Sequence, residues 1–544
     1  MKPNCLLLSA GLFAAAFVAP AFAHPDDASN KGMPAKETFG RVFFKTSCTP
    51  EAQKQFDRAL AMLHSFYFPE TVKAFTAIPE TDPACAIAYW GLAVSTRPNP
   101  LVGPWDAATL KRGLDAVEKG RAVGAKTQRE RDWIEAIGEV YKDFDKVDQD
   151  TRTKNYEKAM EELTRKYPND IEAKIFYALA LNESFDHGDK SYANLLKAAK
   201  LLEPLDRKYP DHPGITHYII HSLDFAPLAR RGLPAANKYA KIAPSSPHAL
   251  HMPSHIYSMI GMWEASIASN LRSVANANEY AAKNKMDGTL AGVPHSYDFM
   301  QYAYLQLGQD AKAKALIEDT STITKVLGAP LVGATARAAV PARFMLERQD
   351  WGGAAQLKPL DTKFPAAEAI TYFARAMGAA RTNNFSAAQA DIDKLKEQRA
   401  AMEKANQSYW AEQVEVQILG AQAWLAQGQG KREEALKFMR AAADLEDGSE
   451  KHVAMENRLY PMRELLADML IVQGNPALAL TEYETSMKNA PARLRGFYGA
   501  AKAAEATGDK QKAAAYYRSL TRLTRNADGD RAELRDARQH IASK

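Results

Sequence analysis

The segments GNPALALTEY (474–483) and GDKQKAAAYY (508–517) share one pattern of residue types and lie 34 residues apart. Each begins with a glycine, has a small residue five positions later and ends on an aromatic residue four positions after that. Glycine tolerates the left-handed backbone of a tight turn between helices. A repeat of this length predicts pairs of antiparallel helices that stack on one another to bury a continuous core.

The pattern resembles that of the tetratricopeptide repeat family, in which a proline also closes each unit. The same offset of 34 links Trp351 to Phe385, and Pro83 and Pro491 follow two of the units. Further units begin at three glycines whose spacing is longer: Gly261, Gly308 and Gly430. The resemblance implies an all-α solenoid, a right-handed superhelix of antiparallel helix pairs in which some repeats exceed 34 residues.

The composition of the chain changes along its length and suggests five regions. We expect a signal peptide (1–23), a flexible lead (24–38), divergent repeats that carry most histidines (39–310), further repeats (311–526) and a capping helix with a tail (527–544).

The N-terminal residues have the three parts of a secretory signal. Lys2 gives a positive start, residues 6–18 are apolar, and Ala21-Phe22-Ala23 fits the cleavage rule for small residues. We therefore predict cleavage after Ala23 and a periplasmic or secreted protein. No later segment reaches the ~18 apolar residues of a membrane span.

The charged residues of the 544-residue chain nearly balance, with 70 Lys and Arg against 65 Asp and Glu. Because the two signs interleave and no basic block occurs, we do not expect nucleic acid as a partner. Cys48 and Cys85 are 37 residues apart, close to one repeat. In an oxidising compartment this favours a disulfide, although buried cysteines also serve as small apolar residues.

Histidines concentrate in one segment, 212–255, which holds six of the twelve: His212, His217, His221, His248, His251 and His255. Two pairs, His217/His221 and His251/His255, are spaced four apart, which places both rings of a pair on one helix face. Neutral imidazole is the commonest protein metal ligand and suits zinc, copper and iron.

The glycine turns assign three consecutive helices, at 212–223, 247–260 and 294–307, to equivalent places in neighbouring repeats. Their side chains should therefore converge. The predicted metal ligands are His217, His221, His251 and His255, with His295, Asp224 and Asp298 as completing groups. His64 would join them if the superhelix curls far enough.

Two classes of function remain open from the sequence. The first is an exported scaffold that binds a peptide or protein segment in its concave groove, the usual role of the family. The second is a metal-dependent enzyme or metal-handling protein. The pair His217–His221 lacks the glutamate of the HExxH motif, and no nucleotide-binding loop or nucleophile elbow occurs, so catalytic residues are not assigned. Structural roles for individual histidines also remain open.

Overall fold

The computed structural model describes residues 37–456 and 458–542, and those from Thr38 onward form one compact unit. The predicted signal peptide, 1–23, and nearly all of the predicted lead lie outside the described residues.

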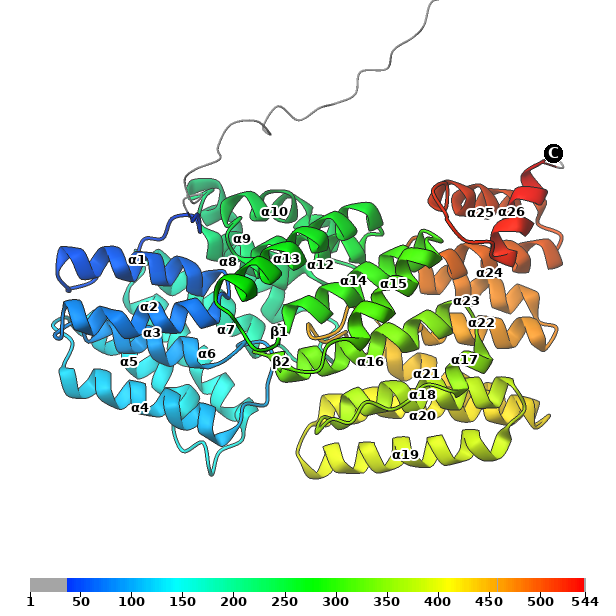
Figure 1. The fold of residues 1–544 in the computed structure, drawn as a ribbon, viewed down its shortest axis with the longest axis horizontal. Helices are drawn as coiled ribbons and strands as arrows, with labels where there is room; N and C mark the ends of the chain where they lie inside the picture. Colours follow the sequence, from blue (N-terminus) through cyan, green and yellow to red (C-terminus); the bar gives the residue numbers. More distant parts are fainter. Residues whose placement is uncertain (1–36, 457, 543–544) are drawn as a thin grey trace, which may run out of the picture. The chain divides into compact units, whose positions relative to one another are not determined.

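Helices follow one another along the described chain, and successive helices pack together as antiparallel pairs (Figure 1). The first thirteen are α1 (Pro50–His64), α2 (Phe68–Thr81), α3 (Ile87–Thr96), α4 (Ala107–Val123), α5 (Gln128–Tyr141), α6 (Gln149–Lys166), α7 (Ile171–Glu183), α8 (Ala193–Lys208), α9 (Pro213–Leu223), α10 (Ala229–Ile242), α11 (Pro247–His251), α12 (Pro253–Met259) and α13 (Trp263–Lys283). The others are α14 (Gly292–Gln306), α15 (Asp310–Ser321), α16 (Pro330–Glu347), α17 (Trp351–Ala355), α18 (Pro365–Arg381), α19 (Phe385–Lys404), α20 (Ser408–Gly428), α21 (Arg432–Gly448), α22 (Met462–Val472), α23 (Pro476–Asn489), α24 (Leu494–Ala506), α25 (Lys510–Leu523) and α26 (Ala532–Ala542). The predicted all-α helical-repeat fold is confirmed.

One short sheet interrupts this pattern within the described residues. Strands β1 (Thr289–Leu290) and β2 (Val326–Leu327) pair in parallel, one before α14 and the other before α16. The pair joins two connecting segments, which lie next to the predicted metal site.

The turns between paired helices have the backbone that the repeat pattern predicts. Gly474 and Gly508 adopt φ angles of 79° and 80°, in the left-handed region that favours glycine. Asn383 takes this place before α19 with φ 63°, since asparagine tolerates the same conformation.

In two of the units, the aromatic residue packs against a glycine of the next helix. A Cβ atom added at Gly499 of α24 would lie 2.2 Å from the ring of Tyr483 on α23. Phe75 of α2 meets Gly91 of α3 in the same way, also at 2.2 Å. Because glycine has no side chain, the aromatic ring can pack closely against the backbone of the next helix and fill the space between neighbouring units.

The core consists of several clusters of buried apolar side chains. The two largest lie mainly within residues 44–259 and 332–513, and a smaller one spans 263–344. The predicted boundary at residue 310 falls inside this smaller cluster.

Cys48 and Cys85 are joined by a disulfide with a Cα–Cα distance of 4.9 Å. Among the described residues, no helix combines the length and apolarity needed to cross a membrane.

A buried ion-pair network joins helices on either side of the predicted boundary at residue 310. The guanidinium of Arg493, just before α24, binds Glu464 of α22 through two hydrogen bonds of 2.7 and 2.9 Å. It also lies 2.7 Å from Glu347 at the end of α16 and donates to the hydroxyl of Tyr302 on α14. All three charged side chains are at most 1% exposed.

Candidate metal centre

The three predicted histidine-bearing helices lie side by side in the structure. Residues 212–223 form α9, with His212 as its N-cap, and residues 294–307 correspond to α14. The predicted helix 247–260 is divided at Met252 into α11 and α12, each of which begins with a proline. Because α12 contacts both α9 and α14, the imidazoles of all these helices meet.

The first triad consists of His217 and His221 of α9 and His248 of α11. Nε2 of His217 lies 3.1 Å from Nε2 of His248 and 3.0 Å from Nε2 of His221. In a tetrahedral site with Zn–N bonds of about 2.0–2.1 Å, ligand nitrogens are about 3.3 Å apart. Nε2 of His217 is therefore spaced from each of the other two as ligands of a single ion are, and ligand nitrogens of all three rings lie within 4.8 Å of one another.

A hydrogen bond orients the central ring of the first triad. Nδ1 of His217 lies 2.7 Å from the carbonyl oxygen of His64, which can only accept. The proton of His217 is consequently on Nδ1, and its Nε2 directs a lone pair toward the other two rings. Metal-binding histidines are commonly held by such a bond on the opposite nitrogen.

The second triad consists of His251 of α11, His255 of α12 and His295 of α14. The Nε2 atoms of His251 and His255 are 3.0 Å apart, and one ring nitrogen of His295 lies within 4.8 Å of both. Nδ1 of His295 is buried and has no hydrogen-bond partner. This triad therefore also gathers three imidazoles with an unsatisfied nitrogen.

Two hydrogen bonds fix the protons in the second triad. Nδ1 of His251 lies 2.6 Å from Oδ1 of Asn270, whose amide nitrogen is engaged by a backbone carbonyl. Nδ1 of His255 lies 2.6 Å from Oδ2 of Asp224. Both rings thus donate through Nδ1, and their Nε2 lone pairs face each other across 3.0 Å. Such an arrangement is repulsive unless a cation lies between the two nitrogens.

The electrostatic environment keeps these rings neutral. Burial lowers the pKa of His251 to about 4. Burial and the neighbouring imidazoles hold the pKa values of His217 and His255 well below the usual value of 6.5. Neutral imidazole is the form that binds metals, so the site offers ligands without first releasing protons.

Asp224 is the acidic group nearest to the second triad. Besides His255 it binds Lys451, whose Nζ lies 2.7 Å from the same oxygen, Oδ2. Burial raises the pKa of Asp224, while Lys451 opposes the rise. Asp224 thus contacts the far nitrogen of a ligand ring instead of facing the point where the imidazoles meet, and its role is to orient that ring.

The two triads are neighbours. The ring centroids of His221 and His255 are 6.1 Å apart, and those of His248 and His251 are 6.2 Å apart. A phenylalanine covers each triad: Phe66 packs on all three rings of the first, and Phe299 on all three rings of the second. The arrangement suits a pair of adjacent ions shielded from water.

Asp298 is not brought to the imidazoles. Its carboxylate lies 3.2 Å from the guanidinium of Arg343, and both side chains are buried. Because Arg343 neutralises this carboxylate, Asp298 is left out of the ligand set that we propose.

His64 lies beside the first triad but in a different network. Its Nε2 is 3.0 Å from Glu172, and Nε2 of His212 is 3.0 Å from the other oxygen of the same carboxylate. The remaining nitrogens bind the hydroxyl of Tyr218 and the backbone N–H of Ile215. Burial would raise the pKa of Glu172, but the His212 and His64 rings hold it well below its usual range. Because every nitrogen has a partner, we interpret this group as a structural network that holds the His64 carbonyl against His217.

The predicted ligands are grouped differently in the structure. His217, His221, His251 and His255 are predicted as one set, whereas the structure divides them between two triads. His248 is absent from the predicted set, although a position three before His251 lies on the same side of a helix. Lys451 and Asn270 were missed because no spacing rule connects them to the histidine segment.

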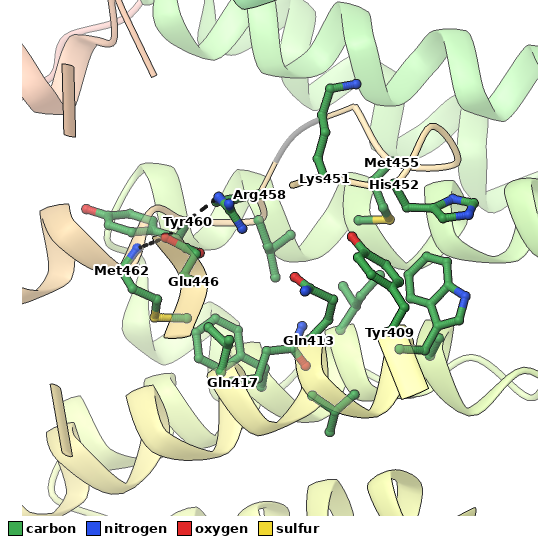
Figure 2. A pocket seen from close by; sticks show the side chains of 17 residues that line it. Tyr409, Gln413, Gln417, Glu446, Lys451, His452, Met455, Arg458, Tyr460 and Met462 are labelled. Atoms are coloured by element: carbon green, nitrogen blue, oxygen red, sulfur yellow. Dashed lines mark hydrogen bonds and ion pairs between the residues drawn. The ribbon is translucent and has the colours of Figure 1, made fainter. Parts of the chain in front are cut away.

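A cavity of about 70 Å³, shown in Figure 2, is lined in part by residues within 451–455 and 458–462. The buried carboxylate of Glu446 accepts a 2.7 Å hydrogen bond from the backbone N–H of Met462 on its wall. Arg458 lies 3.9 Å from the same carboxylate oxygen. Burial raises the pKa of Glu446 from 4.5 to about 7, although Arg458 opposes the rise.

This raised pKa predicts a pH-dependent stability. Glu446 binds its proton more tightly in the folded state than in the unfolded state. Its contribution to the free energy of unfolding is therefore complete below pH 4.5 and is lost as pH rises through about 7. The variant Glu446→Gln should not show this loss of stability. At 1.36 kcal/mol per pKa unit, the loss in the unchanged protein amounts to roughly 3 kcal/mol. Urea unfolding of both proteins from pH 4.5 to pH 8 measures the difference, and parallel stability curves would contradict the prediction.

No protein-family profile matches this chain, and no curated protein matches it at a significant level of sequence similarity. Solved structures with similar helical arrangements include a human IFIT1 dimer with m7Gppp-AAAA, at 11% identity and a TM-score of 0.38. They also include a human IFIT1 dimer with PPP-AAAA, at 12% identity and a TM-score of 0.38. Each likeness covers 80% of this chain and 90% of the other.

One expectation is corrected by these structures. The interleaved charges predict that nucleic acid is not a partner, whereas both IFIT1 structures contain oligonucleotide ligands. The exclusion of nucleic acid as a partner is withdrawn.

Proposed function

We propose that this chain is a metalloprotein in which each triad binds one transition-metal ion, and that the pair of ions serves a metal-dependent reaction. The observation that carries the proposal is the facing pair of Nε2 lone pairs in the second triad, 3.0 Å apart. A structural histidine pair would place a proton between its nitrogens. Here Asn270 and Asp224 bind the Nδ1 protons instead.

Copper is the metal that the surroundings favour. Neither triad contains a carboxylate, and the nearest acid, Asp224, is already paired with Lys451. Two divalent ions would therefore bring several uncompensated positive charges into a buried site, which is costly. Monovalent copper halves that charge, and imidazole is among the ligands that suit copper. Zinc is the main competitor, since three imidazoles with one open position are also a known zinc arrangement.

Two neighbouring ions with open positions can bind a substrate between them and stabilise charge that develops during its reaction. The ligand histidines supply the frame, Asp224 and the His64 carbonyl orient the rings, and Phe66 and Phe299 limit water. The disulfide between Cys48 and Cys85 suits an oxidising compartment. This supports export, together with the predicted signal peptide at 1–23.

Elemental analysis of the purified full chain tests the proposal. The metal-free protein is incubated separately with copper, under reducing conditions, and with zinc, and unbound metal is removed by gel filtration. We expect one ion per triad, with copper retained in competition against zinc. A chain that retains neither metal would overturn the proposed function, and preferential retention of zinc would overturn the choice of copper.

A further inference from the structure

A cavity of about 330 Å³ opens directly onto the two triads. His251, His255 and His295 of the second triad contribute to its wall, and so does His248 of the first. Other parts of the wall come from the start of α2, the end of α3, α13 and the β1–β2 pair. The volume of the cavity is at the low end of the ~300–1,000 Å³ typical of small-molecule sites.

The wall of this cavity carries no aspartate, glutamate, lysine or arginine among the described residues. Its apolar part includes Phe66, Phe68, Val72, Ala277 and Val332. A charged group on this part of the ligand, away from the imidazoles, would lose its hydration without gaining an ion pair.

Three hydroxyl groups on the wall donate hydrogen bonds within the protein. Ser95, Thr96 and Ser273 each donate to a backbone carbonyl oxygen of their own surroundings. The buried Nδ1 of His295, by contrast, has no partner. A buried nitrogen without a hydrogen-bond partner is therefore available to the polar group of a ligand at the imidazole end of the cavity.

We infer that this cavity binds an uncharged, largely apolar small organic molecule, whose single polar end faces the metal ion of the second triad. This inference rests on the proposed function for the role of the metal, but the cavity itself requires no metal. The small volume and the uncharged wall match neither a peptide chain nor a phosphate-bearing ligand. The reaction would act on the polar end, because only this end reaches the ions.

Two probes of the same shape test the charge requirement. Para-cresol is uncharged, whereas para-hydroxybenzoate carries a carboxylate in place of the methyl group. Isothermal titration calorimetry is carried out with the metal-free full chain and again with the metal-loaded chain. We expect para-cresol to bind both forms, and the loaded form more tightly. We expect para-hydroxybenzoate to bind at least about tenfold more weakly, a difference of 1.4 kcal/mol.

Two variants test whether para-cresol binds in this cavity. Ala277 lines the cavity from α13 and is 3% exposed, whereas Ala275 on the same helix is exposed. Ala277→Phe should weaken para-cresol binding at least about tenfold and retain metal, while Ala275→Phe should change neither. If Ala277→Phe does not fold, Gly292→Phe serves instead, because a Cβ atom at Gly292 would meet no atom within 4 Å.

The outcomes separate the two proposals. A chain that retains metal but binds para-cresol equally well in the cavity variant, or binds para-hydroxybenzoate as tightly, overturns the cavity assignment alone. A chain that binds para-cresol in the cavity but retains no metal overturns the proposed function and the orientation toward an ion. Binding that is tighter in the metal-loaded chain, and lost in the cavity variant, supports both.

Discussion

Replacement of His255 by alanine should remove the ion of the second triad and leave the ion of the first in place. His255 supplies one of two facing Nε2 atoms, and His251 and His295 alone would leave the ion with two imidazoles. The matching variant His217→Ala should remove the ion of the first triad, in which Nε2 of His217 is the central nitrogen. Elemental analysis after gel filtration gives the metal content of each variant.

The control for this experiment is His540→Ala. His540 lies on α26 and binds Glu505, far along the chain from both triads. Its replacement should leave the metal content unchanged. The double variant His217→Ala/His255→Ala should retain no metal, and circular dichroism should show unchanged helix content. A folded double variant with the metal content of the natural chain would refute the ligand assignment.

The largest effect on stability is expected from Arg493→Leu. This change leaves Glu347 and Glu464 buried, without the cation that pairs with both. Although burial opposes it, these two carboxylates hold the pKa of Arg493 well above its usual value. Removal of one partner from a buried ion pair typically costs about 3–5 kcal/mol. Thermal and urea unfolding should therefore show a large loss of stability for this variant.

A compensating variant shows whether Arg493→Leu loses stability because charges are left unpaired or because packing is lost. Arg493→Leu combined with Glu347→Gln and Glu464→Gln removes the two uncompensated charges and should recover part of the stability. If the triple variant is no more stable than Arg493→Leu, the charge argument fails. Arg525→Leu is a suitable control, because its ion pair with Glu264 is exposed and such pairs contribute about 0–1 kcal/mol.

The repeat fold could be predicted because its signals are local. A glycine turn, a small residue and an aromatic residue at fixed spacing report on contacts between adjacent helices, as Tyr483 and Gly499 illustrate. The break of the 247–260 helix at Met252 was not predicted, although Pro253 directly after it gave a signal, since proline removes a helical hydrogen bond.

The site could be predicted only in part. Spacing alone identified His217/His221 and His251/His255 as pairs on helix faces. It could not show that each pair takes its third ring from a following helix, because this depends on the angle between α9, α11 and α14. Nor could it remove Asp298 from the set, since its partner Arg343 lies on a different helix.

The bond between Lys451 and Asp224 makes the centre depend on the whole chain. A fragment that ends before residue 451 would contain all six ligand imidazoles, but it would lack the ammonium group that balances the buried aspartate. Asp224 would then have to bind a proton or draw in solvent, and His255 would lose its fixed orientation. Residues 212–295, which hold all six ligand imidazoles, should therefore make a poorer chelator than these rings suggest when they are transplanted alone into another helical scaffold.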